Sequence, residues 1–171
     1  MADELLDLVN KNDEVIGTVL KSAAHKNPAL LHRESFIVLI TKDRKVLLQQ
    51  RSMSKKNSPG EWKITAGGHV LAGEDPAEAV IRETKEELGI DIQPVYLSKK
   101  FAKHKDMEAR FYWIYYQIVD HELPFVLQEE EVMDAKWVGI DDLEDFSKNY
   151  DYDLESTSHK TIMEIVELVG L

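Results

Sequence analysis

The pattern of apolar and polar residues along the chain predicts several strands. SFIVLIT, residues 35–41, is a nearly continuous run of apolar and β-branched residues, which is typical of a strand buried on both faces. A turn at Asp43 and Arg44 leads into a second expected strand at 45–52. Residues 64–70, ITAGGHV, are rich in glycine and form either a strand or a loop. The other expected strands are a small hairpin around Asn12-Asp13, 94–102, 108–119 and 133–140.

Three segments are expected to be helical. Asp75 is a favourable N-cap residue, and Pro76 suits the first helical position. Gly89 stands where a C-terminal glycine cap is expected, so this helix should be about 13 residues long. A short helix is expected in DDLEDFSKN, 141–149, and a packing helix in TIMEIVELVG, 161–170. Because strands and helices do not alternate as βαβ units, the pattern predicts an α+β fold.

The first of these helices carries a cluster of carboxylates. Glu83, Glu86 and Glu87 stand at positions i, i+3 and i+4, so their side chains can converge on one face. A divalent cation would offset their repulsion, and oxygen-only ligands suit Mg²⁺ or Mn²⁺. On spacing alone, an ordinary solvent-facing acidic surface is the alternative. The side chains of this helix that are expected in the core are Ala77, Val80, Ile81, Thr84 and Leu88.

Composition places the chain among ordinary globular proteins. With 171 residues, 43% of them hydrophobic and 31% charged, we expect one folded domain over 1–171. A formal net charge of -11 argues against a nucleic-acid backbone or an anionic membrane as the main partner. Cysteine is absent, which excludes disulfides, thiolate metal ligands and a cysteine nucleophile. Neither a signal peptide nor an apolar stretch of membrane-spanning length is evident, so a cytoplasmic location is expected.

Gly68, Glu74 and the segment 82–90 match a known pattern. The segment reads RETKEELGI, and with the two earlier residues it resembles the Nudix box, GX5EX7REUXEEXGU with U aliphatic. Every fixed position matches over 68–90, and the one departure is Thr84, where an aliphatic residue is usual. The resemblance implies an α/β/α sandwich around a mixed β-sheet, in which the box helix presents a metal site. It also implies hydrolysis of a diphosphate linked to another group, by attack of water on phosphorus.

The same resemblance implies roles for the residues of the box. Glu83, Glu86 and Glu87 would hold Mg²⁺ or Mn²⁺, with one carboxylate serving as base. Arg82 would orient Glu83, and Glu74 would bind Arg82 or help to shape the loop. The substrate stays open, because the box acts on the diphosphate only. Nucleoside triphosphates, nucleoside-diphosphate sugars, dinucleotides, coenzyme A and isoprenoid diphosphates are all candidates.

Outside the box, the chain resembles the type I isopentenyl-diphosphate isomerases and their hydrolase-like relatives. Matching pieces extend over about 5–140 and include LLHRESFIVLI, LLQQRSMSKKNSPGEW and EEEVMDAKW. The three histidines that bind a metal in those isomerases fall on His25, His32 and His69, and Glu108 matches one of their glutamates. The resemblance therefore implies either a second metal site or three histidines that serve other purposes.

Two departures argue against isomerase activity. The isomerases need a catalytic cysteine just before their Gly-His pair, where this chain has Gly67. The second glutamate of their metal site is replaced by Arg110, whose charge would repel a cation. We therefore expect a diphosphate hydrolase. The alternatives are isomerase-like activity and a ligand-sensing domain without turnover.

Three residues outside the box are further candidates for the site. Arg51 and Lys55 fall where the isomerase-like branch holds the diphosphate, although basic residues in a loop can also be merely solubilising. Glu131 precedes Trp137 at a spacing where many Nudix proteins carry an additional metal ligand or base, and an exposed acidic loop is the alternative. The expected partner is a small-molecule diphosphate, and exposed sheet edges could support a homodimer.

Overall fold

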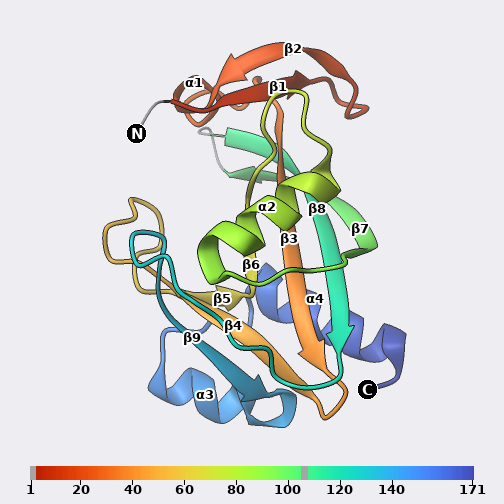
Figure 1. The fold of residues 1–171 in the computed structure, drawn as a ribbon. Helices are drawn as coiled ribbons and strands as arrows, with labels where there is room; N and C mark the ends of the chain where they lie inside the picture. The colour runs from red at the N-terminus through yellow and green to blue at the C-terminus, as the bar shows by residue number, and fades with distance from the viewer. Residues whose placement is uncertain (1–2, 105–107) are drawn as a thin grey trace.

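The computed structural model describes residues 3–104 and 108–171. Its strands are β1 (Leu5–Val9), β2 (Val15–Leu20), β3 (His32–Thr41), β4 (Lys45–Arg51), β5 (Trp62–Ile64), β6 (Ala66–His69), β7 (Val95–His104), β8 (Glu108–Val119) and β9 (Val132–Gly139). Its helices are α1 (Lys21–Ala24), α2 (Pro76–Leu88), α3 (Leu143–Asn149) and α4 (Thr157–Val169), with a single 3-10 turn, η1 (Ile140–Asp142), among the described residues. β1 and β2 form a separate hairpin, and the other seven strands form one sheet (Figure 1).

The seven-stranded sheet is mixed, as the resemblance implied. β3 and β8 run parallel, from His32 opposite Arg110 to Thr41 opposite Val119. The other pairings within this sheet are antiparallel. β3 therefore lies in the middle of the sheet, which agrees with the apolar character of the sequence from which it forms.

Helices cover both faces of this sheet, which confirms the expected α/β/α sandwich. Successive residues of a strand point to opposite faces. Ile37 and Leu39 of β3 belong to the core beneath α2, together with Val80 and Leu88 of that helix. The intervening residues of β3 pack with α3 and α4 on the other face. Figure 1 shows α2 in front of the sheet and α4 behind it.

β3 and β4 separate beyond the turn that joins them. A single pair, Ile40 and Val46, is in register between the two strands. Farther from the turn, Thr65 connects them, because its Oγ1 accepts a hydrogen bond from the Leu39 amide at 2.9 Å and donates one to the Leu47 carbonyl at 2.6 Å. At Thr65 the chain passes from β5, which pairs with β4, to β6, which pairs with β3. The separation leaves β6 packed against α2.

Helix α2 begins and ends where the sequence predicts. The Asp75 carboxylate accepts a hydrogen bond from the Ala77 amide at 2.8 Å, and Gly89 caps the end with a left-handed φ of 68°. Thr84, the departure from the Nudix box, is fully buried. Its hydroxyl donates to the Val80 carbonyl at 2.6 Å, so the polar group is satisfied within the helix.

One predicted core position of α2 is wrong. Ile81 is 39% exposed, whereas Ala79 and Glu87, which were not expected in the core, are buried. The buried side of the helix is therefore turned toward Glu87. The reason is a polar contact that periodicity does not reveal: the Gln49 amide of β4 donates to the Glu87 carboxylate at 3.0 Å, so a charged side chain can occupy the buried position.

The two C-terminal helices differ in detail from the prediction. α3 begins at Leu143 rather than at 141, because residues 140–142 form the turn η1. α4 begins at Thr157 rather than at 161, because the Ser156 hydroxyl accepts a hydrogen bond from the His159 amide at 3.2 Å. No helix in the described part of the chain has the length and apolar character needed to cross a membrane.

Candidate active site

The candidate site lies where β6 meets α2. Gly67 and Gly68 pair with Phe36 and Ser35 of β3 and present bare backbone at this junction. A β-carbon on Gly68 would lie 2.4 Å from Cδ of Glu83. Gly67 has a φ of 157°, and a β-carbon there would lie 2.4 Å from both the Ser35 carbonyl and the Phe36 ring. Gly67 therefore requires glycine, whereas a side chain at Gly68 would displace the Glu83 carboxylate.

Arg82 connects the Glu74 loop to the carboxylates of α2. Its Nε and Nη2 donate to the two Glu74 oxygens at 2.8 and 3.0 Å, a bidentate arrangement. Its Nη1 donates to Glu83 at 2.8 Å and lies 3.4 Å from Glu86, while Nη2 also reaches the His69 carbonyl at 3.1 Å. Arg82 therefore links Glu83 directly to the Glu74 loop.

Glu87 is a buried carboxylate with a fixed orientation. One of its oxygens accepts hydrogen bonds from the Gln49 amide at 3.0 Å and from the Gly67 backbone amide at 3.3 Å. Burial raises the pKa of Glu87, and the positive charge of Lys63 opposes that change. The carboxylate is therefore held in place by the sheet before any ligand binds.

Glu83 and Glu86 complete the carboxylate cluster. Burial, followed by the negative charge of Glu87, raises the pKa of Glu83 to about 7. The Glu86 side chain is 54% exposed. Arg82 pairs directly with Glu83 and Glu86 and, among the described residues, not with Glu87. Burial and the charge of Glu87 therefore make the ionised form of Glu83 unfavourable. A divalent cation fits this donor set, because it binds carboxylate oxygens and favours their ionised form.

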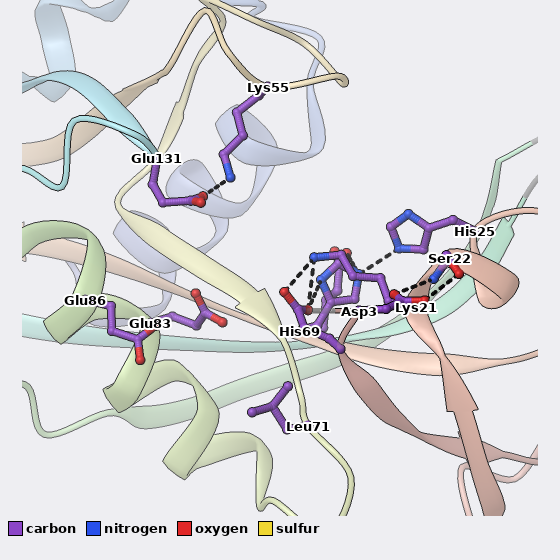
Figure 2. Close-up of polar contacts among 12 residues, drawn as sticks. Asp3, Lys21, Ser22, His25, Lys55, His69, Leu71, Glu83, Glu86 and Glu131 are labelled. Carbon is purple, nitrogen blue, oxygen red and sulfur yellow. Dashed lines mark hydrogen bonds and ion pairs between the residues drawn. The ribbon is translucent and has the colours of Figure 1, made fainter. Parts of the chain in front are cut away.

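Residues of the β4–β5 loop lie close to the carboxylate cluster. Lys55 forms an ion pair with Glu131, and Figure 2 shows this pair in the same region as Glu83 and Glu86. After burial, the charge of Glu131 is a further cause that raises the pKa of Glu87, so Glu131 acts on the same site. Arg51 donates from Nε to the Asn57 carbonyl at 3.0 Å, and none of the described carboxylates forms an ion pair with it.

Three histidines, His25, His32 and His69, lie close to one another beside this site. The Nε2 atoms of His25 and His69 are 2.8 Å apart, and Nε2 of His69 lies 3.1 Å from the Glu34 carboxylate. One ligand atom from each of these four residues lies within 4.8 Å of the others. Burial lowers the pKa of His32 and of His69, which favours the neutral imidazole that binds metals. Figure 2 shows His69 between His25 and the glutamates of α2.

Two atoms of this histidine cluster lack hydrogen-bond partners. Nε2 of His32 and Oε2 of Glu108 are buried without one among the described residues. Nδ1 of His32 lies 3.3 Å from the Leu30 carbonyl, which orients the ring and leaves Nε2 free. Arg110 is close by, because its guanidinium donates to Glu34 at 2.7 Å and lies 3.1 Å from Glu108. Nε2 of His32 is therefore free, Oε2 of Glu108 lies 3.5 Å from Nε2 of His25, and Arg110 brings the positive charge that the sequence predicted.

Three residues of the two clusters were not expected from the sequence. Glu34 lies two residues after His32 on one strand, so the two-residue period of strands could have identified it. Gln49 and Lys63 stand directly opposite each other on β4 and β5. Neither belongs to a recognised motif, and their closeness to Glu87 follows only from the register of the sheet.

Known proteins resemble this chain in sequence and in fold. A family model, NUDIX domain, matches residues 31–157. Over 86 residues the chain is 46% identical to the isopentenyl-diphosphate Delta-isomerase of Streptomyces avermitilis, a match that covers 50% of this chain and only 44% of the isomerase. YfcD of Escherichia coli, an uncharacterized Nudix hydrolase, is 34% identical over 145 residues, covering 82% of this chain and 76% of YfcD. The crystal structure of DR0079 from Deinococcus radiodurans has a TM-score of 0.74 at 21% identity, covering 94% of this chain and 98% of DR0079, which shows a shared fold.

Proposed function

The chain belongs to the NUDIX domain family of Nudix hydrolases, and we propose that it hydrolyses a diphosphate linkage in a small molecule with Mg²⁺ or Mn²⁺ as cofactor. The observation that most supports this proposal is the position of Glu83 and Glu87 against the glycines of β6, with Glu86 linked to Glu83 through Arg82. Burial and the charge of Glu87 raise the pKa of Glu83, and a divalent cation would favour its ionised form.

Each residue of the cluster has a part in this proposal. Glu83, Glu86 and Glu87 hold the cation through their carboxylate oxygens, and Arg82 keeps Glu83 in position through its bond of 2.8 Å. When bound, the divalent cation offsets the charge of the diphosphate and lowers the pKa of the attacking water. Gln49 keeps Glu87 pointing into the site.

The proton of the attacking water needs an acceptor, and we assign this role to Glu86 or Glu131. Their side chains are 54% and 25% exposed, so water reaches both. Glu87, by contrast, is buried and accepts two hydrogen bonds from the protein. Lys55 neutralises Glu131 in the free protein, and a phosphate that binds Lys55 would release this carboxylate to act as base.

The sheet supports hydrolysis over isomerisation. Gly67 occupies the position of the isomerase cysteine, and the neighbouring Ser35 carbonyl and Phe36 ring leave no room for a side chain there. Arg51 and Lys55 supply positive charge for the substrate diphosphate. A sensing domain without turnover would not need an intact Nudix box with three carboxylates on one helix, so hydrolysis is also favoured over sensing.

We further propose that the histidine cluster holds a second cation. His25, His32, His69 and Glu34 present donor atoms within 4.8 Å of one another. The free Nε2 of His32 supports this role, because a buried nitrogen without a partner otherwise loses its interaction with water. Imidazole ligands suit Zn²⁺, Mn²⁺ or iron.

A release assay tests the proposed hydrolysis. The wild type is incubated with a panel of diphosphates, including isopentenyl diphosphate, in Mg²⁺ or Mn²⁺, and phosphate release and isomer formation are both measured. We expect metal-dependent cleavage of one substrate class, which Glu86→Gln abolishes without unfolding the protein. Glu78→Gln, which removes an exposed carboxylate from the first turn of the same helix, should retain activity. Tight metal-dependent binding of one diphosphate without any cleavage would overturn the proposal.

A further inference from the structure

Lys63 is a half-buried residue of β5 whose ammonium group has no ion pair or side-chain hydrogen bond with the part of the chain that the structure describes. Lysines that are withdrawn from water are usually paired with an acceptor. No motif recognised in the sequence includes this residue. An unpaired cation inside the fold therefore needs a reason.

The register of the sheet directs Lys63 toward the carboxylate cluster. Its neighbours Trp62 and Ile64 lie in the core on the side of α4, so Lys63 points to the opposite face. On that face it stands directly across from Gln49, whose amide bonds to Glu87. The positive charge of Lys63 lowers the pKa of Glu87 against the effect of burial, which places the two charges within electrostatic reach.

Arg51 lies on the same face as Lys63. The Arg51 amide bonds to the Glu61 carbonyl at 3.0 Å, which continues the register that pairs Gln49 with Lys63. Arg51 and Lys63 are thus diagonal neighbours across β4 and β5, a spacing that long side chains can bridge. The charge of Arg51, acting after burial, lowers the pKa of Lys63. The charges of Glu87, Glu34 and Glu61 act on Lys63 in the opposite sense, but none of the described carboxylates forms an ion pair with Lys63 or Arg51. The two cations therefore repel each other at close range, and a bound anion would offset that repulsion.

We propose that Lys63 and Arg51 together bind a phosphate group of the substrate, beside the cation held by the carboxylate cluster. This inference rests on the proposed function and adds a substrate-binding residue to it. It has a second consequence. Because the charge of Lys63 acts on Glu87, it opposes cation binding while no phosphate is present. Replacement of Lys63 by a neutral residue should therefore change metal affinity and phosphate affinity in opposite directions.

The test compares Lys63→Met, Lys63→Arg and a charge-matched control, Lys42→Met. Lys42 is 69% exposed and pairs with Asp120 on the surface, so its loss changes the net charge equally. The probes are Mn²⁺ alone and the non-hydrolysable methylenediphosphonate in saturating Mn²⁺, both measured by calorimetry. We expect Lys63→Met to bind Mn²⁺ about fivefold more tightly. It should bind the diphosphonate at least about tenfold more weakly. Lys63→Arg and Lys42→Met should stay within about threefold of the wild type for both probes.

The outcomes separate this inference from the proposed function. Unchanged diphosphonate affinity in a folded Lys63→Met protein would overturn the inference, and so would weaker binding of Mn²⁺. If Lys63→Met also hydrolyses substrate normally while Glu86→Gln does not, the hydrolase proposal stands and only the role of Lys63 fails. If the wild type cleaves no diphosphate but its diphosphonate affinity depends on Lys63, the anion site stands and the hydrolase proposal fails. Thermal unfolding of each variant shows whether Lys63→Met is folded, and Lys63→Gln replaces it if it is not.

Discussion

Gly68 and Glu83 are in such close contact that a β-carbon on the glycine would lie 2.4 Å from the Cδ of the glutamate. The first residue of the Nudix box therefore has a steric purpose. Its missing side chain leaves the space that the Glu83 carboxylate occupies, and Arg82 holds the carboxylate there from the other side.

Gly68→Ala should reduce hydrolysis far more than it reduces stability. The added methyl group forces Glu83 out of its position, and removal of a metal ligand from its proper place should cost about 100-fold or more in kcat. Gly17→Ala is the matched control, because no atom lies within 4 Å of a β-carbon at that position. Steady-state kinetics and thermal unfolding of both variants check the prediction. Full activity of Gly68→Ala would contradict the steric role.

Glu83 should make the metal-free protein less stable, relative to a Glu83→Gln variant, as pH rises from about 5 to 8. The pKa of Glu83 is raised to about 7 from its usual 4.5 by burial and by Glu87. Between these values the folded state binds more protons than the unfolded state, so the free energy of unfolding falls with rising pH and stays lower above pH 7. Glu83→Gln removes this effect.

Urea denaturation in the presence of a chelator checks this expectation. The stability of the wild type relative to Glu83→Gln should fall by up to about 3 kcal/mol between pH 5 and pH 8. Saturating Mn²⁺ should restore the wild type at the upper end of this range, since the cation favours the ionised carboxylate. A difference between the two proteins that does not vary with pH would mean that Glu83 ionises as it does in the unfolded chain.

Arg82→Lys should lower kcat by about 10- to 100-fold, with a smaller change in KM. A lysine has one ammonium group and cannot bond to Glu74 in bidentate fashion while also holding Glu83. Arg44→Lys, which alters an exposed ion pair with Asp141, provides the control. Equal activities of the two variants would rule out a positioning role for Arg82.

Gly67→Cys should not create an isomerase, although it restores the residue that the resemblance associates with isomerisation. The φ of 157° opposes any side chain at this position, and so does the Ser35 carbonyl, which would lie 2.4 Å from the new β-carbon. We expect a loss of stability of about 2 kcal/mol or more. Product analysis with isopentenyl diphosphate and a thermal unfolding experiment check this. Detectable isomerisation by the variant would show that the sheet adapts.

His25→Ala should remove one bound metal ion and leave the other. If both proposed sites bind, the wild type should hold about two Mn²⁺ per chain and the variant about one. His121→Ala, at an exposed position, should behave as the wild type. Elemental analysis after dialysis gives the count. Equal metal content in all three proteins would mean that the histidine cluster binds no metal. Arg110 would then be the cation that neutralises Glu34 and Glu108.

The sequence alone predicted most of the elements in their order, although not α1 or β5, and it grouped the carboxylates of α2. Both are recorded in local patterns: the apolar run of β3, the caps of α2, and the fixed spacing from Gly68 to Ile90. A helix brings residues three and four positions apart onto one face whatever surrounds it, so Glu83, Glu86 and Glu87 could be grouped before the fold was known. The resemblance likewise grouped the three histidines.

Tertiary structure decided the rest. The rotation of α2 against the sheet was not predictable from its periodicity, which placed Ile81 in the core, because the hydrogen bond that buries Glu87 comes from Gln49 on a distant strand. The arrangement of Lys63 and Arg51 depends on the register between β4 and β5, and a shift of one residue would turn each side chain to the other face. Contacts within one helix follow from the sequence spacing, whereas contacts between strands exist only once the sheet has formed.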